Sequence, residues 1–473
     1  MKKTNFGAFA TLISIFFFWG FVAASNDILI PVFKKALTLS QFESQWISLA
    51  FYIAYTVGSL LYFGISSLLK RDILNVIGYR NGLALGLIIS ALGTLLFIPA
   101  SNNASFPLLI SGLFTVGLGF SLQQIAANPL AIQMGDPSKG NMRLSLAGGI
   151  NNVGTTIGPV IVSFAIFGGL SSGETTLNLQ AVQTPYLFLG AAFIIAAIFF
   201  KFSSVPDRLT EETENSGGNI MATLKYPQVI LGMIAIFVYV GVEVSTASNL
   251  PEFMKQKLGT EESAVAPFVS LFWASLMIGR WTSAAGAFNM KESTKMKLSL
   301  LLPFVAFGIF AFVNMIGGQD MSIFYPYLLI VIVLAVADAI CEGNPVKQIL
   351  LYSALGILAL IIGIFSSGMT SVFAFISVGL FCSTLWPCIF TLGISGLGEK
   401  TNTASSLLIM MIMGGGFISA AQGYFADNDK LGIQHSYWVG VLCFAYLLFF
   451  AWSVSKQLKK QGITDFSTSK DSH

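Results

Sequence analysis

Asp27 is a carboxylate inside a segment that is otherwise apolar enough to lie in a lipid bilayer. The stretch AFATLISIFFFWGFVAASNDILIPVF, residues 8–33, is long enough to cross the hydrocarbon core. An ionisable side chain at that depth is costly unless it faces a protein interior or a water-filled path. We therefore expect Asp27 to bind a proton or another cation; a hydrogen bond that only packs two helices together is the alternative.

Glu243 is a second carboxylate far inside an apolar segment, FVYVGVEVSTASNLP. It could share one central cavity with Asp27 and either bind a cation or accept hydrogen bonds from sugar hydroxyls. A salt bridge or a packing bond between helices is the alternative. The pair Asp27 and Glu243 is our expected cation-coupling site.

Uncharged amides and aromatic rings complete the set of candidate substrate-binding residues. These are Gln123, Gln124, Asn128, Asn151, Asn152, Trp273 and Trp386. Amides inside membrane-spanning helices either bond neighbouring helices or bind a polar, uncharged ligand. Indole rings can stack on the apolar face of a sugar, although core packing is the more common role of any one such ring.

The composition predicts an all-α integral membrane protein. Of 473 residues, 55% are hydrophobic and 10% are charged, whereas soluble proteins have about 25% charged residues. Two histidines give no basis for a histidine-built metal site, and there is no phosphate-binding GxxxxGK[ST] loop. We expect no enzyme activity, no cofactor beyond a coupling H⁺ or Na⁺, no nucleic-acid partner and a monomer.

Fourteen apolar segments of spanning length divide into six, a polar linker, and eight. The first six lie near 8–33, 44–69, 77–99, 106–134, 144–168 and 184–203. The others lie near 228–254, 264–288, 297–317, 322–341, 348–367, 369–396, 402–425 and 434–455. The domains predicted are 1–203, a linker at 204–226, and 227–473.

The positive charges predict the orientation. With a cytoplasmic N-terminus, 20 of the 25 Lys and Arg residues fall in inside loops and 5 in outside loops. Both termini are then cytoplasmic, in what we expect to be a bacterial inner membrane. Arg280 is counted among the inside charges, as an orientation or gate residue.

The two halves also contain similar sequences. The first helix of one half ends in Pro31-Val-Phe33-Lys, and that of the other ends in Pro251-Glu-Phe253-Met. Related helical halves joined by a linker are typical of transporters in which the halves rock about a central site. Chance similarity between apolar helices is the alternative.

Several blocks taken together resemble the L-fucose permease-like sugar symporters of the major facilitator superfamily. They are FFFWGFVAASNDILIP, AANP, RLSLAGGINNVG, YVGVE, MIGR, and FTLGISGLG followed by IMGGGF. The resemblance implies two six-helix bundles and cation-driven uptake. It also implies roles in coupling and sugar binding for Asp27 and in sugar binding for Asn151.

The chain departs from the fucose permease at three polar positions. That permease has a glutamate where this chain has Gln124, and a glutamine at the positions of Gly148 and Glu243. Since an amide cannot transfer a proton as a carboxylate does, we expect glucose, galactose or an amino sugar rather than fucose. A fucose or disaccharide carrier, a non-transporting sugar sensor and a membrane-embedded enzyme are the alternatives.

The segments at about 297–341 have no counterpart in a core of two six-helix bundles. We expect them to form an inserted hairpin of two membrane-spanning helices. Because two crossings are added, the C-terminus stays on the cytoplasmic side.

Overall fold

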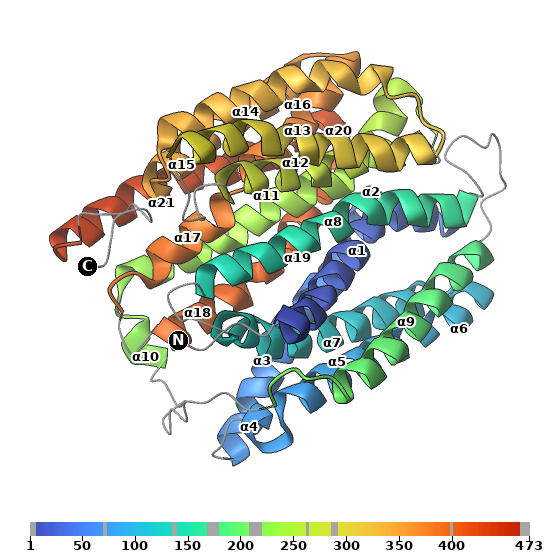
Figure 1. The fold of residues 1–473 in the computed structure, drawn as a ribbon. Coiled ribbons are helices and arrows are strands. Elements are labelled where there is room, and N and C mark those ends of the chain that lie inside the picture. The colour runs from blue at the N-terminus through green and yellow to red at the C-terminus, as the bar shows by residue number, and fades with distance from the viewer. Residues whose placement is uncertain are drawn as a thin grey trace.

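The computed structural model describes residues 6–69, 73–134, 140–167, 179–207, 220–261, 264–284, 292–397 and 401–463. In these ranges the chain is built from helices, without a strand (Figure 1). The chain ends, which we predict to be cytoplasmic, and most of the predicted linker lie outside the described residues.

The N-terminal half comprises α1 to α9. Its elements are α1 (Phe6–Ala36), α2 (Gln41–Ser44), α3 (Trp46–Leu69), α4 (Ile73–Ile77), α5 (Tyr79–Leu95), α6 (Phe97–Asn102), α7 (Phe106–Gln133), α8 (Gly140–Phe167), η2 (Leu179–Val182) and α9 (Gln183–Lys201).

The C-terminal half, from α11 on, follows the short helix α10 (Ile220–Thr223). Its elements are α11 (Pro227–Leu258), α12 (Ala266–Ala284), α13 (Glu292–Ile316), η5 (Ser322–Tyr327), α14 (Leu328–Cys341), α15 (Pro345–Phe365), α16 (Gly368–Cys382), α17 (Leu385–Ile394), α18 (Thr401–Met410), η7 (Met411–Met413), α19 (Gly414–Ala426), α20 (Gly432–Ser436) and α21 (Trp438–Lys460).

The number of membrane-spanning helices is close to the fourteen predicted from the sequence. Within the described residues, 13 helices are long and apolar enough to cross a membrane. Helix α12, at the predicted segment 264–288, is not among these 13; it has 19 residues and packs along α8 and α13.

The same helix pairings recur in the two halves. In the first, α1 packs along α8, α7 packs along α3 and α5, and α5 packs along α9. In the second, α11 packs along α19, α16 packs along α12 and α15, and α15 packs along α21. Helices α13 and α14 fall outside this repeat and pack mainly on α12 and α15. This confirms the expected fold of two six-helix bundles with an inserted hairpin.

Glycine allows α1 and α8 to approach closely. Gly154 and Gly158 are four residues apart on one face of α8, a spacing that permits close helix contact in membranes. A Cβ atom on Gly158 would lie 2.6 Å from the carbonyl oxygen of Phe21, and Gly154 packs equally tightly on Phe17. Larger side chains here would separate the helix that contains Asp27 from α8.

The two halves meet along several helices. Helix α8 packs against α12, α3 packs against α19, and α1 touches both α11 and α12. Hydrogen bonds cross this interface from Ser270 Oγ to the Thr156 carbonyl, at 2.7 Å, and from Thr56 Oγ1 to the Met410 carbonyl, at 2.9 Å. The candidate site lies along this interface.

Candidate functional site

Asp27 and Trp273 lie together although they come from different halves. The Trp273 Nε1–H on α12 donates a hydrogen bond to Asp27 Oδ2 on α1, with an N–O distance of 2.8 Å. Only 2% of Asp27 and 4% of Trp273 are exposed. Because the donor to this buried carboxylate comes from the opposite half, the charge of Asp27 affects the contact between the halves.

Glu243 occupies a different environment on α11. It is half-buried, and its Oε2 accepts a short hydrogen bond from the hydroxyl of Tyr239, one helical turn earlier. The guanidinium of Arg280 lies close enough to interact electrostatically with this carboxylate. Glu243 therefore faces a cation and a phenol, whereas Asp27 faces an indole.

Arg280 on α12 forms hydrogen bonds with residues of both halves. Its Nη1 donates to Asn152 Oδ1 on α8 at 3.2 Å, and its Nε donates to the Ser383 carbonyl at 3.1 Å. That carbonyl is available because Pro387, four residues on, has no N–H to donate to it. The break between α16 and α17 thus provides an acceptor for this arginine.

Tyr52 on α3 is near both acids. Its half-buried side chain interacts electrostatically with Asp27 and with Glu243. On its other side, the ring lies against α19, where a Cβ on Gly415 would be 3.3 Å from Tyr52 Cδ1. The two carboxylates are therefore parts of one polar region between the halves, although they do not bond each other directly.

The neighbouring glutamines on α7 point to different surroundings. Gln123 is fully buried inside the N-terminal half, where its Oε1 accepts from Trp19 Nε1 at 3.0 Å and its Nε2 donates to Ser90 Oγ at 3.2 Å. Gln124 is half-buried and forms a hydrogen bond with Tyr55 of α3. Gln123 thus bonds helices of one bundle, and Gln124 lies on the side of α7 that faces α3.

The remaining predicted substrate residues are spread over three helices. Asn151 is half-buried on α8, and its Nδ2 donates to the Phe16 carbonyl of α1 at 2.9 Å. Asn128 is half-buried on α7, one turn beyond Gln124. Trp386 is half-buried on α17 and stacks on Phe390, with 5.0 Å between ring centroids. The structure thus places Trp273, but not Trp386, in contact with Asp27.

Asn152 has unused hydrogen-bonding capacity. Its Oδ1 accepts from Arg280, while its Nδ2 is buried without a hydrogen-bond partner. A buried unpaired donor is costly, so a ligand hydroxyl that accepted from it would recover that cost. This is the property expected of an amide that binds a polyol.

Tyr52 and Tyr239 were not predicted from the sequence to be site residues, and Arg280 was not predicted to take part in the site. The tyrosines gave no signal, because phenol groups in apolar helices are common in cores. Arg280 was expected to be an orientation or gate residue, and in the structure it bonds Asn152 of α8 and the Ser383 carbonyl just after α16. Its position four residues after Leu276 and seven after Trp273, on the same face of α12, is the signal that could have placed it there.

The chemistry of this region is that of protonation and hydrogen bonding. Among the described residues, no group of three or more His, Cys, Asp or Glu could hold a metal ion. Two carboxylates, an arginine, tyrosines and amides could instead bind a proton or a monovalent cation together with a ligand rich in hydroxyls.

The chain is similar in sequence to known transporters. The family model described as Major Facilitator Superfamily matches residues 7–345. A glucose/galactose transporter of Brucella abortus is 30% identical over 458 residues, 96% of each chain. An L-fucose-proton symporter of Escherichia coli is 26% identical, over 94% of this chain and 92% of its own.

A solved structure has the same fold. The crystal structure of the transporter FucP in the outward conformation is matched with a TM-score of 0.62 and 25% identity, over 94% of this chain and 98% of that one. These similarities extend over both halves of the chain.

Proposed function

Because the chain belongs to the Major Facilitator Superfamily, we propose that it is a secondary active transporter that imports a hexose-type sugar with H⁺ or Na⁺. The relatives named as glucose/galactose transporters support the sugar class. We favour glucose, galactose or an amino sugar over fucose. The transporter would act in a bacterial inner membrane, with both termini cytoplasmic.

The hydrogen bond between Asp27 and Trp273 is the observation that carries this proposal. A hydrogen bond to an ionised carboxylate is roughly twice as strong as a neutral one. Neutralising Asp27 with a proton or Na⁺ would weaken the bond and so favour separation of α1 from α12. Loading of the cation is thereby coupled to the relative position of the halves.

Sugar would bind beside this acid, between the two halves. Gln124, Asn128, Asn151 and Asn152 offer amide groups to hydroxyls, and the ring of Trp273 offers an apolar face. Gln123 acts in this scheme by holding Trp19 and α5 in place. Glu243 and Arg280 would supply the polar groups on the side of the site that belongs to the C-terminal half.

Alternating access follows from small energy differences. If loaded and empty carriers differ by a few kcal/mol in their preferred conformation, binding shifts the population between states. Rocking of the halves would then expose the sugar to the cytoplasm.

The decisive experiment is uptake by proteoliposomes across a panel of hexoses and amino sugars, with H⁺ and Na⁺ gradients imposed separately. Asp27→Asn should abolish gradient-driven accumulation and leave some exchange, because it removes the site of neutralisation. Asp320→Asn, in the exposed turn between α13 and η5, is the matched control and should transport normally. Unchanged accumulation in Asp27→Asn would refute the coupling role.

Counterflow of labelled sugar distinguishes a transporter from the two alternatives, a sugar sensor and a membrane-embedded enzyme. A sensor on the same fold would bind sugar and show no counterflow. A membrane-embedded enzyme would convert the sugar, so recovery of unmodified sugar inside the liposomes excludes it.

A further inference from the structure

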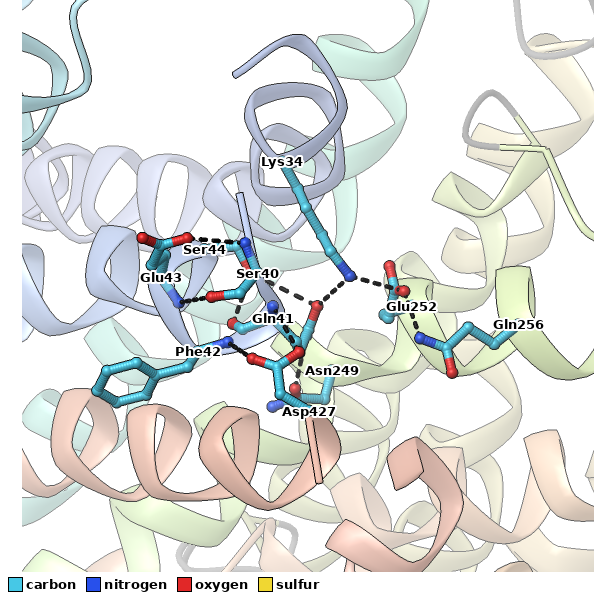
Figure 2. Close-up of polar contacts among 10 residues, drawn as sticks. All are labelled: Lys34, Ser40, Gln41, Phe42, Glu43, Ser44, Asn249, Glu252, Gln256 and Asp427. Atoms are coloured by element: carbon cyan, nitrogen blue, oxygen red, sulfur yellow. Dashed lines mark hydrogen bonds and ion pairs between the residues drawn. The ribbon is translucent and has the colours of Figure 1, made fainter. Parts of the chain in front are cut away.

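A second polar network joins the halves at the ends of α1 and α11, where Lys34 lies seven residues beyond Asp27 on α1. Lys34 Nζ lies 2.7 Å from Glu252 Oε1, and these side chains are 18% and 9% exposed. Lys34 also donates to Gln41 Oε1 at 2.9 Å, and Gln256 donates to Glu252 Oε1 at 2.6 Å (Figure 2). The positive-inside rule places this end outside the cell.

Helix α2 forms the second part of the network. The backbone N–H groups of Gln41 and Phe42 donate to the two carboxylate oxygens of Asp427, at 2.9 and 2.7 Å (Figure 2). Asp427 directly follows α19 in the C-terminal half. Gln41 Nε2 also donates to Asn249 Oδ1 of α11, at 2.8 Å.

The start of α2 is prepared for this contact by its own sequence. Ser40 and Glu43 form a capping box, in which the Ser40 Oγ accepts from the Glu43 N–H and the Glu43 carboxylate accepts from the Ser40 N–H. The N–H groups of Gln41 and Phe42 remain available for a partner. Asp427 supplies both acceptors from the opposite half.

Close packing accompanies these bonds. A Cβ on Gly423 of α19 would lie 2.9 Å from Gln45 Cγ and 3.0 Å from the Gln41 carbonyl oxygen. Ser248 of α11 is buried beside it and donates to Gln45 Oε1 at 3.0 Å. The two halves are therefore in direct contact at this end, and separating them must break each of these interactions.

We propose that Lys34, Gln41, Asn249, Glu252 and Asp427 form the outer gate of the transport cycle, and we call them the outer gate network. The proposal rests on the transport function above. The network joins α1 and α2 to α11 and α19, so it stabilises the state that is closed to the outside. It lies apart from the residues assigned to sugar and cation, so its loss changes the population of states and leaves the binding groups in place.

The test is accessibility of a cysteine placed behind the gate. The four native cysteines are buried, and Ser248→Cys adds a buried thiol at the interface. A membrane-impermeant maleimide is applied to intact cells and, separately, to inside-out vesicles. In this background, Glu252→Gln and Asp427→Asn should each raise the labelling rate from the outside by about fivefold or more.

Two further variants distinguish a gate from general loosening. Exchanging the charges, Lys34→Glu with Glu252→Lys, should return labelling toward the parent rate. Gly423→Val adds bulk between α19 and α2 and should raise outside labelling without removing a charge. The matched control is Glu342→Gln, which breaks an exposed ion pair with Lys347 inside the C-terminal half and should leave the rate unchanged.

The proposal is overturned if neither single variant labels faster than Glu342→Gln, or if the charge exchange labels as fast as Glu252→Gln. The assay requires no sugar. Failure of uptake with every sugar would therefore refute the transport proposal without affecting this result.

Discussion

Replacing Trp273 with phenylalanine tests the link between the halves most directly. The substitution keeps an aromatic ring against α1 but removes the N–H that donates to Asp27 Oδ2 at 2.8 Å. Because both side chains are buried, water is poorly placed to replace the lost donor. A hydrogen bond to a charged group contributes about 1.5–3 kcal/mol, and one between neutral groups about 0.5–1.5 kcal/mol.

The size of the effect therefore reports on the charge of Asp27. We expect Trp273→Phe to lower the free energy of unfolding by about 1.5–3 kcal/mol if the carboxylate is ionised. In an Asp27→Asn background the same change should cost no more than about 1.5 kcal/mol, since the acceptor is then neutral. The difference is the coupling energy of a double-mutant cycle.

The assay is denaturant unfolding in mixed micelles, followed by circular dichroism because the chain contains seven tryptophans. Trp438→Phe is the matched control, since Trp438 is 40% exposed on α21, and it should change stability by less than about 0.5 kcal/mol. A cost for Trp273→Phe equal to that of the control, or a coupling energy of zero, would refute the reasoning.

Two further predictions concern Glu243 and the α1–α8 contact. Glu243→Gln removes the charge facing Arg280 and should weaken sugar binding or coupling in proteoliposome uptake; normal values of both would remove Glu243 from the site. Gly20→Ala should lower stability by about 1–3 kcal/mol, because its Cβ would collide with the backbone of Asn151. Gly308→Ala, where a Cβ meets nothing within 4 Å, is the control, and an equal melting temperature for the two variants would contradict this account.

Much of the fold could be predicted because the bilayer imposes it. A membrane-spanning segment must satisfy its backbone internally and remain apolar over a fixed length. The expected segment 106–134 accordingly corresponds to α7 (Phe106–Gln133). Breaks were harder to predict: the segment 369–396 is two helices, α16 and α17, because Pro387 removes a backbone donor.

The inserted hairpin was likewise predicted only in part from the sequence. Its two segments could be counted from hydropathy, and their lack of a counterpart followed from the resemblance. Where they pack was not available from the sequence. The structure places α13 along α12 and α14 beside α15, because only the tertiary fold decides which faces of the core helices remain to be covered.

For the site, the sequence by itself identified which residues are too costly to leave in lipid. Asp27 and Glu243 stood out because a carboxylate in an apolar helix needs a protein partner. Which partner each acid has was decided by the tertiary structure. Asp27 accepts a hydrogen bond from the Trp273 N–H, whereas Glu243 accepts one from the Tyr239 hydroxyl and faces Arg280.

The amides illustrate the same limit. Gln123 and Gln124 are adjacent and chemically identical, yet one is buried within a bundle and the other bonds Tyr55. Successive residues on a helix point about 100° apart, and the sequence does not say which direction faces the opposite half. The sequence therefore determined the fold and the costly groups, while the packing of α1, α8, α11 and α12 decided which of them meet.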